Sequence, residues 1–389
     1  MIWQPQLPER YTSMSNQELD AAITARKGQL GDRLIILGHH YQQDDVYKHA
    51  DFTGDSFKLA QLAAEKVAQS GSQYVVFLGV HFMAESADIL TPPDVKVILP
   101  DLTAGCSMAD MAQIDDVVEA WDAIHAALEE RGWSGRIVPV TYMNSTAAIK
   151  AFVGEHGGAV CTSSNAAQVI RWALEGGAEP RLPGESIKVM FFPDQHLGRN
   201  TAAAIGFDVH HDMTMWDPRT PLEVGGTTPE ALERSTILLW KGHCSVHKLF
   251  RPEHVDQIKA AEPHRTVIVH PECERAVVEK ADMTGSTEKI MRTIREALPG
   301  SKWAIGTEVH MVMRLAREAA QRNVHVRILS DCQCLCTTMY RIDPQHLLWV
   351  LDNLAEDRVV NQVRVDDETR QWALVSLQRM LDITEVVAA

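Results

Sequence analysis

Long apolar runs and cysteine are both scarce in this sequence, and each shortage excludes a class of protein. No apolar run approaches the ~18 residues that a membrane-spanning helix needs, so we expect no membrane partner. The opening residues MIWQPQLPER lack the basic and apolar regions of a signal peptide. Seven cysteines among 389 residues are too few and too unevenly placed for a disulfide framework. We therefore expect a cytoplasmic protein whose cysteines fill the core, react as thiols or bind metal.

Positive charge is also in short supply, with 37 Lys and Arg against 52 Asp and Glu and a net charge of -15. Nucleic-acid phosphates would be repelled by this field, so no nucleic-acid partner is expected. A local basic pocket could still bind a small anionic substrate. Neither a P-loop nor a G-x-G-x-x-G segment is present, which argues against ATP and a Rossmann cofactor.

A weak internal repeat of about 100 residues organises most of the chain. In each of three copies, short β-branched runs alternate with helical patterns, which predicts an α/β fold of parallel sheets covered by helices. The first run of the copies ends at His39, Tyr142 and His270. Each copy closes on cysteine, at Cys106, at Cys244 and in the run from 332 to 336.

The repeat also predicts how the chain divides. Residues 207–233 interrupt the second copy with a Pro-, Gly- and Thr-rich stretch typical of a surface insertion. Ser15 and Glu18 form an S-x-x-E capping box before the first helical pattern. We expect an N-terminal helical segment, three α/β repeats and a C-terminal helical segment, at residues 1–32, 33–118, 119–250, 251–340 and 341–389.

Polar residues follow the predicted strands, where ligands of open α/β sheets bind. Three copies facing a common axis would gather these strand ends into one central site, although any α/β protein has polar residues after its strands. The acid–base candidates are His39, Tyr41, Tyr142, His270 and Glu272. A glutamate there is a plausible base if burial raises its pKa. A histidine after a strand can equally be structural.

A small-residue turn precedes a helical pattern in each copy, at residues 53–56, 162–165 and 284–287. Ser or Thr at a helix start caps backbone N–H groups, and the exposed N–H groups with the helix dipole attract phosphate or carboxylate. Ordinary N-capping needs the same residue types. Three equivalent turns favour a substrate with several anionic groups.

Three cysteines from three copies suit a metal held by thiolates, which select zinc or iron–sulfur clusters. A four-iron cluster usually takes four cysteines, so three would leave one iron open as a Lewis acid. Zinc and buried structural cysteines are alternatives. We expect one of Cys332, Cys334 and Cys336 to bind the cluster.

Many segments of the chain, from Leu34 to Met339, resemble the quinolinate synthase family. The similar segments are GHHYQ, ADFTGDSFKLA, GVHFMAESADIL, LPDLTAGCS, TYMNSTAAIKA, CTSSNA, PDQHLGRN, WKGHCSVH, VHPECE, TGSTEKI, IGTEVHM and CLCTTM. They are long, numerous and in the family's order.

The resemblance implies an enzyme that condenses iminoaspartate with dihydroxyacetone phosphate, giving quinolinate, phosphate and water for NAD biosynthesis. It implies three α/β/α domains in pseudo-threefold arrangement around one active site, and a transient contact with an L-aspartate oxidase. A [4Fe-4S] cluster with one open iron is expected on Cys106, Cys244 and Cys336. Cys336 is preferred because the segment from Cys336 to Met339 matches the family's C-P-x-M segment.

The resemblance also implies the site residues. They are His39, Tyr41, Ser56, Met83, Tyr142, Asn144, Ser163, His270, Glu272, Ser286 and Thr287. Tyr41 and Glu272 match acid–base groups. Tyr142, Asn144 and His270 match groups that position the intermediate, with Tyr142 and His270 also counted as catalytic. The binding of phosphate and carboxylates falls to His39, Ser56, Ser163, Ser286 and Thr287.

The chain departs from the family's pattern in several places. His40 stands where many members have Tyr or Asn, and Thr337 replaces the proline after the last cysteine. The C-x-C-x-C spacing leaves Cys332 and Cys334 as partners in a strained disulfide or as spare thiols. The 207–233 insertion is longer than in compact members.

Overall fold

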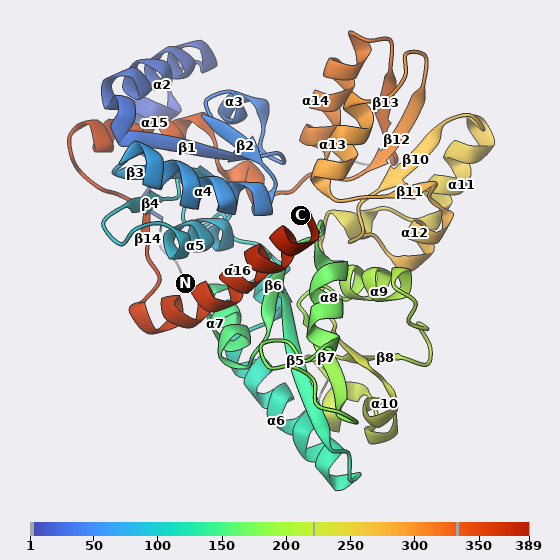
Figure 1. Ribbon diagram of the computed structural model, residues 1–389. Coiled ribbons are helices and arrows are strands. Elements are labelled where there is room, and N and C mark those ends of the chain that lie inside the picture. The colour runs from blue at the N-terminus through green and yellow to red at the C-terminus, as the bar shows by residue number, and fades with distance from the viewer. Residues whose placement is uncertain (1–3, 221, 332–333, 389) are drawn as a thin grey trace. The chain divides into compact units, whose positions relative to one another are not determined.

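The computed structural model describes residues 4–220, 222–331 and 334–388. Contacts between residues group the chain into two compact units. The first unit comprises Met1–Cys106, Glu308–Leu315 and Gln333–Asp366. The second unit comprises Ser107–Thr307, Ala316–Cys332 and Asp367–Ala389. Figure 1 follows the chain through both units.

The first unit contains one five-stranded sheet in the order β14-β4-β3-β1-β2. The pairs among β1 to β4 are parallel, and β14 pairs antiparallel with β4. The strands are β1 (Leu34–His39), β2 (Phe52–Gly54), β3 (Tyr74–Leu78), β4 (Lys96–Ile98) and β14 (Gln362–Val363). The C-terminal segment, expected to be helical, therefore also supplies an edge strand.

The second unit contains two parallel sheets, in the orders β6-β5-β7-β9-β8 and β11-β10-β12-β13. The strands of the first of these are β5 (Gly135–Tyr142), β6 (Ala159–Cys161), β7 (Ser186–Phe192), β8 (Met213–Trp216) and β9 (Ile237–Trp240). The second has β10 (Thr266–Val269), β11 (Met283–Thr284), β12 (Lys302–Gly306) and β13 (His325–Ile328). Strand β8 comes from the 207–233 insertion and pairs with β9 at the sheet edge.

All three sheets share one strand order. Starting from one edge, each sheet has the second strand of its repeat (β2, β6 or β11), then the first (β1, β5 or β10) and then the third (β3, β7 or β12). The strand that precedes the closing cysteine (β4, β9 or β13) comes next. The expected α/β class is confirmed by three mostly parallel sheets flanked by helices. The predicted domain boundaries stay predictions.

The three small-residue turns each overlap or directly follow the end of a short strand that the sequence pattern did not reveal. Strands β2, β6 and β11 are two or three residues long. A run this short carries almost no period-two signal. The strand places each turn at the sheet's carboxyl end.

Helices follow the turns and cover the sheets (Figure 1). Helix α4 (Ser56–Ser70) packs on β1 and β2, and α8 (Ala166–Leu174) packs on β5, β6 and β7. Helix α9 (Gln195–Ala204) lies against β7 and β9, and α5 (His81–Leu90) against β4. The other longer helices are α6 (Ile114–Glu130), α11 (Pro252–Ala261), α13 (Thr287–Arg295) and α14 (Val309–Ala320). Shorter ones are α1 (Glu9–Thr12), α3 (Asp44–Tyr47), α10 (Pro229–Arg234) and α12 (Arg275–Lys280).

The terminal helices act as packing elements. Helix α2 (Asn16–Leu30) begins at the predicted capping box, in which Glu18 Oε2 accepts from the Ser15 N–H at 2.8 Å. It packs on α15 (Pro344–Ala355). Helix α16 (Asp367–Ala388) packs on α7 (Ala147–Glu155) so closely that a Cβ on Gly154 would lie 2.0 Å from the Trp372 carbonyl oxygen.

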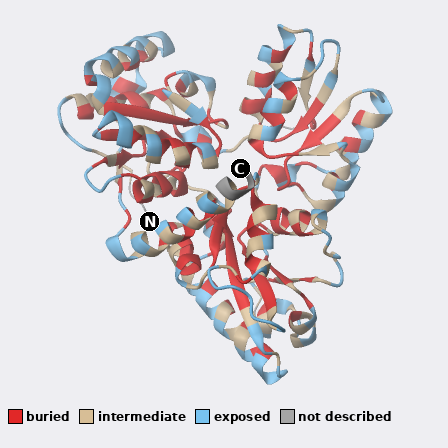
Figure 2. Cartoon of the chain, viewed as in Figure 1, coloured by how far each residue is buried: buried red, intermediate tan, exposed pale blue. Residues whose placement is uncertain are grey.

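Buried residues are concentrated in the strands and in parts of the helices that cover them (Figure 2). Every residue of β1, β3 and β9 is buried, as expected of parallel strands covered on both faces. Trp240 closes the core beside α6 and donates from Nε1 to the Met111 carbonyl at 2.7 Å. Among the described residues, no helix is both long enough and apolar enough to cross a membrane.

Candidate active site

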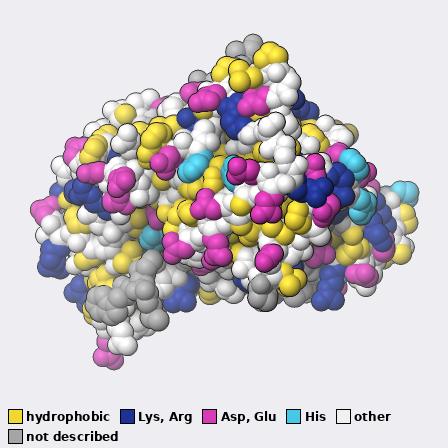
Figure 3. Space-filling view, turned by 90° about the horizontal axis from the view of Figure 1, so that it is seen from below, with side chains coloured by type: hydrophobic (Ala, Val, Ile, Leu, Met, Phe, Trp, Pro, Cys, Tyr) yellow, Lys and Arg dark blue, Asp and Glu magenta, His cyan; other side chains and the backbone are white. Residues whose placement is uncertain are grey.

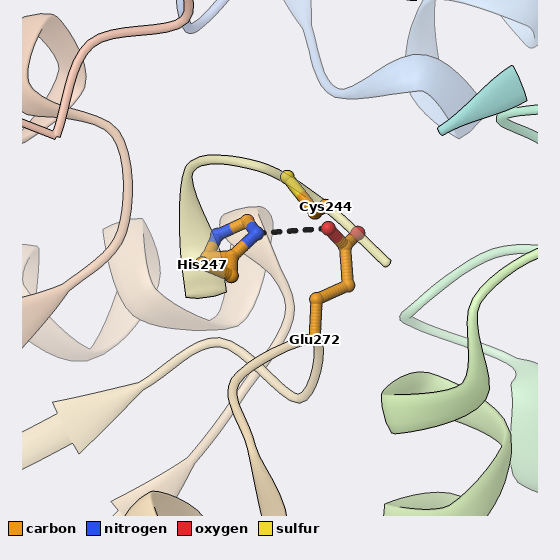
Figure 4. Close-up of side chains that lie close together, drawn as sticks. All are labelled: Cys244, His247 and Glu272. Atoms are coloured by element: carbon orange, nitrogen blue, oxygen red, sulfur yellow. Dashed lines mark hydrogen bonds and ion pairs between the residues drawn. The ribbon is translucent and has the colours of Figure 1, made fainter. Parts of the chain in front are cut away.

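Cys244, His247 and Glu272 meet beyond the carboxyl ends of two strands of the second unit (Figure 4). Cys244 and His247 lie in the segment that follows β9, and Glu272 lies just after β10. One potential ligand atom from each residue lies within 4.8 Å of the other two. His247 Nδ1 and Glu272 Oε2 are 2.8 Å apart, and both side chains are almost fully buried. These three residue types are all able to hold a metal ion.

Asp194 connects this cluster to the rest of the sheet. It follows β7 and caps α9, because its Oδ1 accepts from the N–H groups of His196 at 2.7 Å and Leu197 at 2.8 Å. Its Oδ2 accepts from the Cys244 N–H at 3.2 Å. Burial, with the nearby Glu272 carboxylate, raises the pKa of Asp194 well above its usual value. Asp194 therefore fixes the backbone of Cys244 from a neighbouring strand end.

Glu272 receives hydrogen bonds from two directions. The Tyr142 hydroxyl, at the end of β5, donates to Oε1 at 2.6 Å, and His247 approaches Oε2. His247 in turn reaches the Thr307 hydroxyl through Nε2 at 3.1 Å. The His270 ring stacks on the His247 ring with centroids 4.5 Å apart. Residues at the end of β5 and after β9, β10 and β12 thus form one buried polar network.

The network sets the charge of Glu272. Burial alone would raise the pKa of this carboxyl, but His247, His270 and the Tyr142 hydroxyl together lower it below its usual value. The effect of burial on this carboxyl thus has the direction considered in the sequence analysis, but the neighbouring side chains outweigh it. Burial lowers the pKa of His270 to about 3, so its ring is neutral at pH 7. Because His270 Nδ1 accepts from the Glu272 N–H at 3.3 Å, we infer that its ring proton is on Nε2.

The predicted anion-binding turns of the second unit line one cavity of about 590 Å³. Ser163 follows β6, and Ser286 caps α13 by accepting from the Lys289 N–H at 3.3 Å. Both serines line the cavity together with Pro271, which stands between His270 and Glu272. Thr287, the first residue of α13, is buried. Asn144 follows β5, and its Oδ1 is buried without a hydrogen-bond partner among the described residues.

The first unit holds the other predicted residues. His39 ends β1, and its Nδ1 accepts from the Tyr41 N–H at 3.1 Å. Ser56 begins α4 directly after Asp55, and Met83 is buried in α5. Cys336 Sγ lies 3.5 Å from the Thr338 hydroxyl, and burial raises the pKa of its thiol.

Burial separates the cysteines into two groups. The three predicted ligands, Cys106, Cys244 and Cys336, are partly exposed. The other described cysteines are fully buried, namely Cys161, Cys273 and Cys334. Cys332 lies outside the described residues. Partly exposed thiols can reach a bound cofactor, whereas the fully buried thiols are positioned as core side chains.

The structure therefore brings together Tyr142, His270, Glu272 and Cys244 in the second unit, with Ser163 and Ser286 at an adjoining cavity. That this group and the predicted residues of the first unit belong to one active site remains a prediction. Sequence reasoning missed His247 and Asp194 as members of the site. Their signals were a histidine three residues after Cys244 and an aspartate directly after the buried strand β7 and its proline.

A buried carboxylate, held by a tyrosine and a histidine at the ends of parallel strands and placed beside a thiol, defines an α/β enzyme with acid–base groups next to metal-binding side chains. The particular family follows from comparison with known proteins.

The chain belongs to the quinolinate synthetase A protein family, whose model matches residues 21–382. A quinolinate synthase of Acidobacterium capsulatum is 51% identical over 377 residues, covering 96% of this chain and 95% of that protein. A quinolinate synthase of Nocardioides sp. is 53% identical over 370 residues, covering 94% and 90%. One of Geobacillus thermodenitrificans is 48% identical over 375 residues, covering 96% of each. The resemblance found in the sequence is confirmed, and the protein is an enzyme of the quinolinate synthase type.

Proposed function

We propose that the protein condenses iminoaspartate with dihydroxyacetone phosphate to form quinolinate, phosphate and water, in the cytoplasm and for NAD biosynthesis. The hydrogen-bonded set Tyr142–Glu272–His247 carries the proposal, because ring closure requires proton transfers at carbon and oxygen. The family membership supports it.

We propose a [4Fe-4S] cluster on Cys106, Cys244 and Cys336. The chemistry of the donor set fits, since these three thiols are partly exposed while the other described cysteines are buried. The Cys244 backbone is also fixed by Asp194. When bound, such a cluster would supply one open iron as a Lewis acid. A single zinc ion on Cys244, His247 and Glu272 is the competing candidate, because these ligand types suit zinc.

The residues of this chain would move the protons. Glu272 is ionised, so it can accept a carbon-bound proton, and Tyr142 and His247 stabilise the charge until it does. Neutral His270 can donate its Nε2 proton in a hydrogen bond to a substrate oxygen. Tyr41 is the proposed acid that assists the loss of hydroxide. A tyrosine can serve in this role because it stays protonated at neutral pH.

Ser163, Ser286 and Thr287 would hold the phosphate and carboxylate groups. Helix α13 is nine residues long, and its N-terminus carries Ser286 and Thr287, both buried. Backbone N–H groups and the helix dipole favour an anion at this position. His39 and Ser56 are the proposed counterparts in the first unit, with Met83 and Asn144 shaping the site. A transient contact with an L-aspartate oxidase would deliver the unstable imine.

The test is anaerobic purification with iron, sulfide and zinc analysis, followed by a quinolinate assay with both substrates. We expect iron and acid-labile sulfide in equal amounts and quinolinate formed only when both substrates are present. Zinc in place of iron would contradict the cluster. A cluster-loaded protein that forms no quinolinate would contradict the proposed reaction.

A further inference from the structure

The cavity of about 590 Å³ in the second unit carries cationic side chains that the proposed chemistry does not use. Its walls are residues of α8, α9, α12 and α13 and of the turns before α8 and α13. Arg275, Lys289 and Arg292 line it, and Glu288 is the one carboxylate among its described lining residues. The cavity thus has an excess of positive charge in a chain whose net charge is -15.

Two other cavities of the second unit show that this excess is local. One of about 580 Å³ beside α6 is lined by five carboxylates and by no lysine or arginine among its described residues. Another of about 670 Å³ beside α9 is lined by two arginines and three carboxylates. A cavity lined mainly by one sign of charge concentrates ligands of the opposite sign. Of the three cavities, only the one of about 590 Å³ is suited to an anion.

Arg292 is the most available cation in the cavity. Arg275 Nε donates to Glu279 at 2.8 Å, and Lys289 Nζ donates to the Thr284 carbonyl at 2.9 Å. Arg292 is exposed and has no ion-pair partner within the described part of the chain. A guanidinium in this position can donate two parallel hydrogen bonds to a phosphate.

Asn200 supplies an independent sign of a ligand. It lines the same cavity, is 4% exposed, and donates from Nδ2 to the carbonyls of Pro271 and Cys273, each at 2.8 Å. These two bonds fix the orientation of the amide, so Oδ1 must be the remaining atom. This oxygen is buried and has no partner among the described residues. It calls for a hydrogen-bond donor, which a bare phosphate dianion does not offer.

We propose that this cavity binds a phosphate monoester that carries a free hydroxyl, and that it forms the outer part of the substrate site. Arg292, with Arg275 and Lys289, binds the phosphate, and the hydroxyl donates to Asn200 Oδ1. The cavity is lined by Ser163 and Ser286, which are proposed substrate-binding residues, and by Pro271, which lies between His270 and Glu272 in the chain. The inference rests on the proposed function in taking dihydroxyacetone phosphate as the ligand.

The first test measures binding of dihydroxyacetone phosphate to the cluster-loaded enzyme by calorimetry, without the second substrate. Arg292→Gln should weaken binding about 5- to 20-fold, the loss expected for a charge-assisted hydrogen bond. Arg295→Gln is the matched control, because Arg295 is on the same helix but pairs with Glu318 and does not line the cavity. Glu288→Gln should tighten binding about 2- to 5-fold by removing a like charge. Equal affinities for Arg292→Gln and Arg295→Gln, or weaker binding by Glu288→Gln, would overturn the proposal.

The second test changes the ligand, so that folding cannot confuse the result. Hydroxyacetone phosphate has the same phosphate ester without the free hydroxyl, and it should bind about 3- to 10-fold more weakly because Asn200 Oδ1 stays unpaired. Equal binding of the two esters would remove Asn200 from the site. In turnover, Arg292→Gln should raise KM for dihydroxyacetone phosphate and leave kcat unchanged. A wild-type protein that binds the ester but forms no quinolinate would contradict the proposed function alone, whereas an unchanged KM in an active Arg292→Gln variant would contradict this inference alone.

Discussion

Glu272 keeps its charge in a buried position because other side chains compensate for the lost solvent. Tyr142 and His247 each contact one carboxylate oxygen, and neutral His270 packs on His247. Removing one donor therefore changes the pKa of the Glu272 carboxyl, while the other residues of the site are kept. This coupling makes Glu272 the residue whose contribution can be tested most directly.

The chemical step should depend on Glu272 and Tyr41 more than substrate binding does. Glu272→Gln and Tyr41→Phe should keep the cluster and bind substrate but lose roughly 10²–10⁴-fold in kcat, the usual contribution of a positioned acid or base. Single-turnover assays with cluster content measured in parallel give the comparison. Near-normal kcat in either variant at full cluster content would remove that residue from the mechanism.

Tyr142→Phe should move the acidic limb of the kcat profile to higher pH. The Tyr142 hydroxyl helps to lower the pKa of Glu272, so its loss raises that pKa, and a base is active only above its pKa. The measurement is kcat against pH for wild type and variant. A limb that stays in place would show that Glu272 does not titrate in the rate-determining step.

Cysteine exposure predicts which thiols hold the cluster. Cys106→Ser, Cys244→Ser and Cys336→Ser should each lose iron and activity, because an alkoxide is a poor soft ligand. Cys161→Ser and Cys273→Ser should keep the cluster, since both thiols are buried in the core. Iron analysis and the visible spectrum of anaerobic protein decide between these outcomes. A full cluster in Cys336→Ser would exclude that ligand.

At the scale of elements, the three helix starts that look alike in sequence differ in structure. Asp55 caps α4 and accepts from the Lys58 N–H at 2.9 Å, so a carboxylate already occupies that N-terminus. Ser286 caps α13, whereas Asn165 precedes α8 without a side-chain cap bond. The expected Ser or Thr cap is therefore found only at α13. Helices α8 and α13, which start without a carboxylate cap, are therefore better suited to an anion than α4.

Ser286→Ala combined with Thr287→Ala should weaken binding of phosphate or dicarboxylate ligands. The expected loss is roughly 1–3 kcal/mol if these hydroxyls are buried on binding. Calorimetry with dihydroxyacetone phosphate and with quinolinate measures it, with circular dichroism to check that the helix is kept. Unchanged affinity for both ligands would reduce this turn to a plain helix cap.

The packing of α16 on α7 requires glycine at position 154. Gly154→Ala should cost about 1–3 kcal/mol of unfolding free energy, the usual effect of overpacking, because the new methyl would meet the Trp372 carbonyl. Gly28→Ala in α2 is the control, since a Cβ there meets nothing within 4 Å, and it should gain up to about 1 kcal/mol. Urea unfolding of both variants gives the comparison. Equal stability of the two variants would show that the helices can separate without cost.

The sequence predicted long elements and strand-end residues better than short strands and connections in space. Runs such as Leu34–His39 and the segment after Ser15 carry enough residues to show a period, whereas β11 has two. Tyr142, His270 and Glu272 could be predicted as candidates because each lies at or shortly after the end of a strand. His247 and Asp194 could not, since their roles depend on hydrogen bonds to residues that are distant in the chain.

At the scale of the whole molecule, acidic and basic side chains are interspersed with apolar ones, as one face shows (Figure 3), and the acidic ones are in excess. Buried titratable groups contribute to the pH dependence of stability, because their pKa differs between the folded and the unfolded state. His196 is one of them. Burial, followed by repulsion from Arg199 and other cations, lowers its pKa to about 4.

His196 should make the folded protein less stable at acid pH. A histidine in the unfolded chain has a pKa near 6.5, whereas His196 in the folded protein stays neutral down to about pH 4. Proton binding therefore favours the unfolded state, and the unfolding free energy decreases as the pH falls from about 6.5 toward 4. Between pH 7 and pH 5 this group should account for about 1–2 kcal/mol of lost unfolding free energy. Urea unfolding at both pH values should show a smaller loss in His196→Gln than in wild type. The same loss in both proteins would assign the pH dependence to other groups.

The edge strand β14 is added to the first sheet late in synthesis. When residues 1–106 have left the ribosome, strands β1 to β4 are complete. The outer edge of β4 stays unpaired until Gln362–Val363 are made, near the end of synthesis. Helix α2 likewise lacks its packing partner α15 until late in synthesis. The open edge of β4 is then able to pair with other chains, which is the usual route to aggregation of an unfinished sheet. Nascent chains that stall before β14 should therefore depend on chaperones, whereas full-length chains should not.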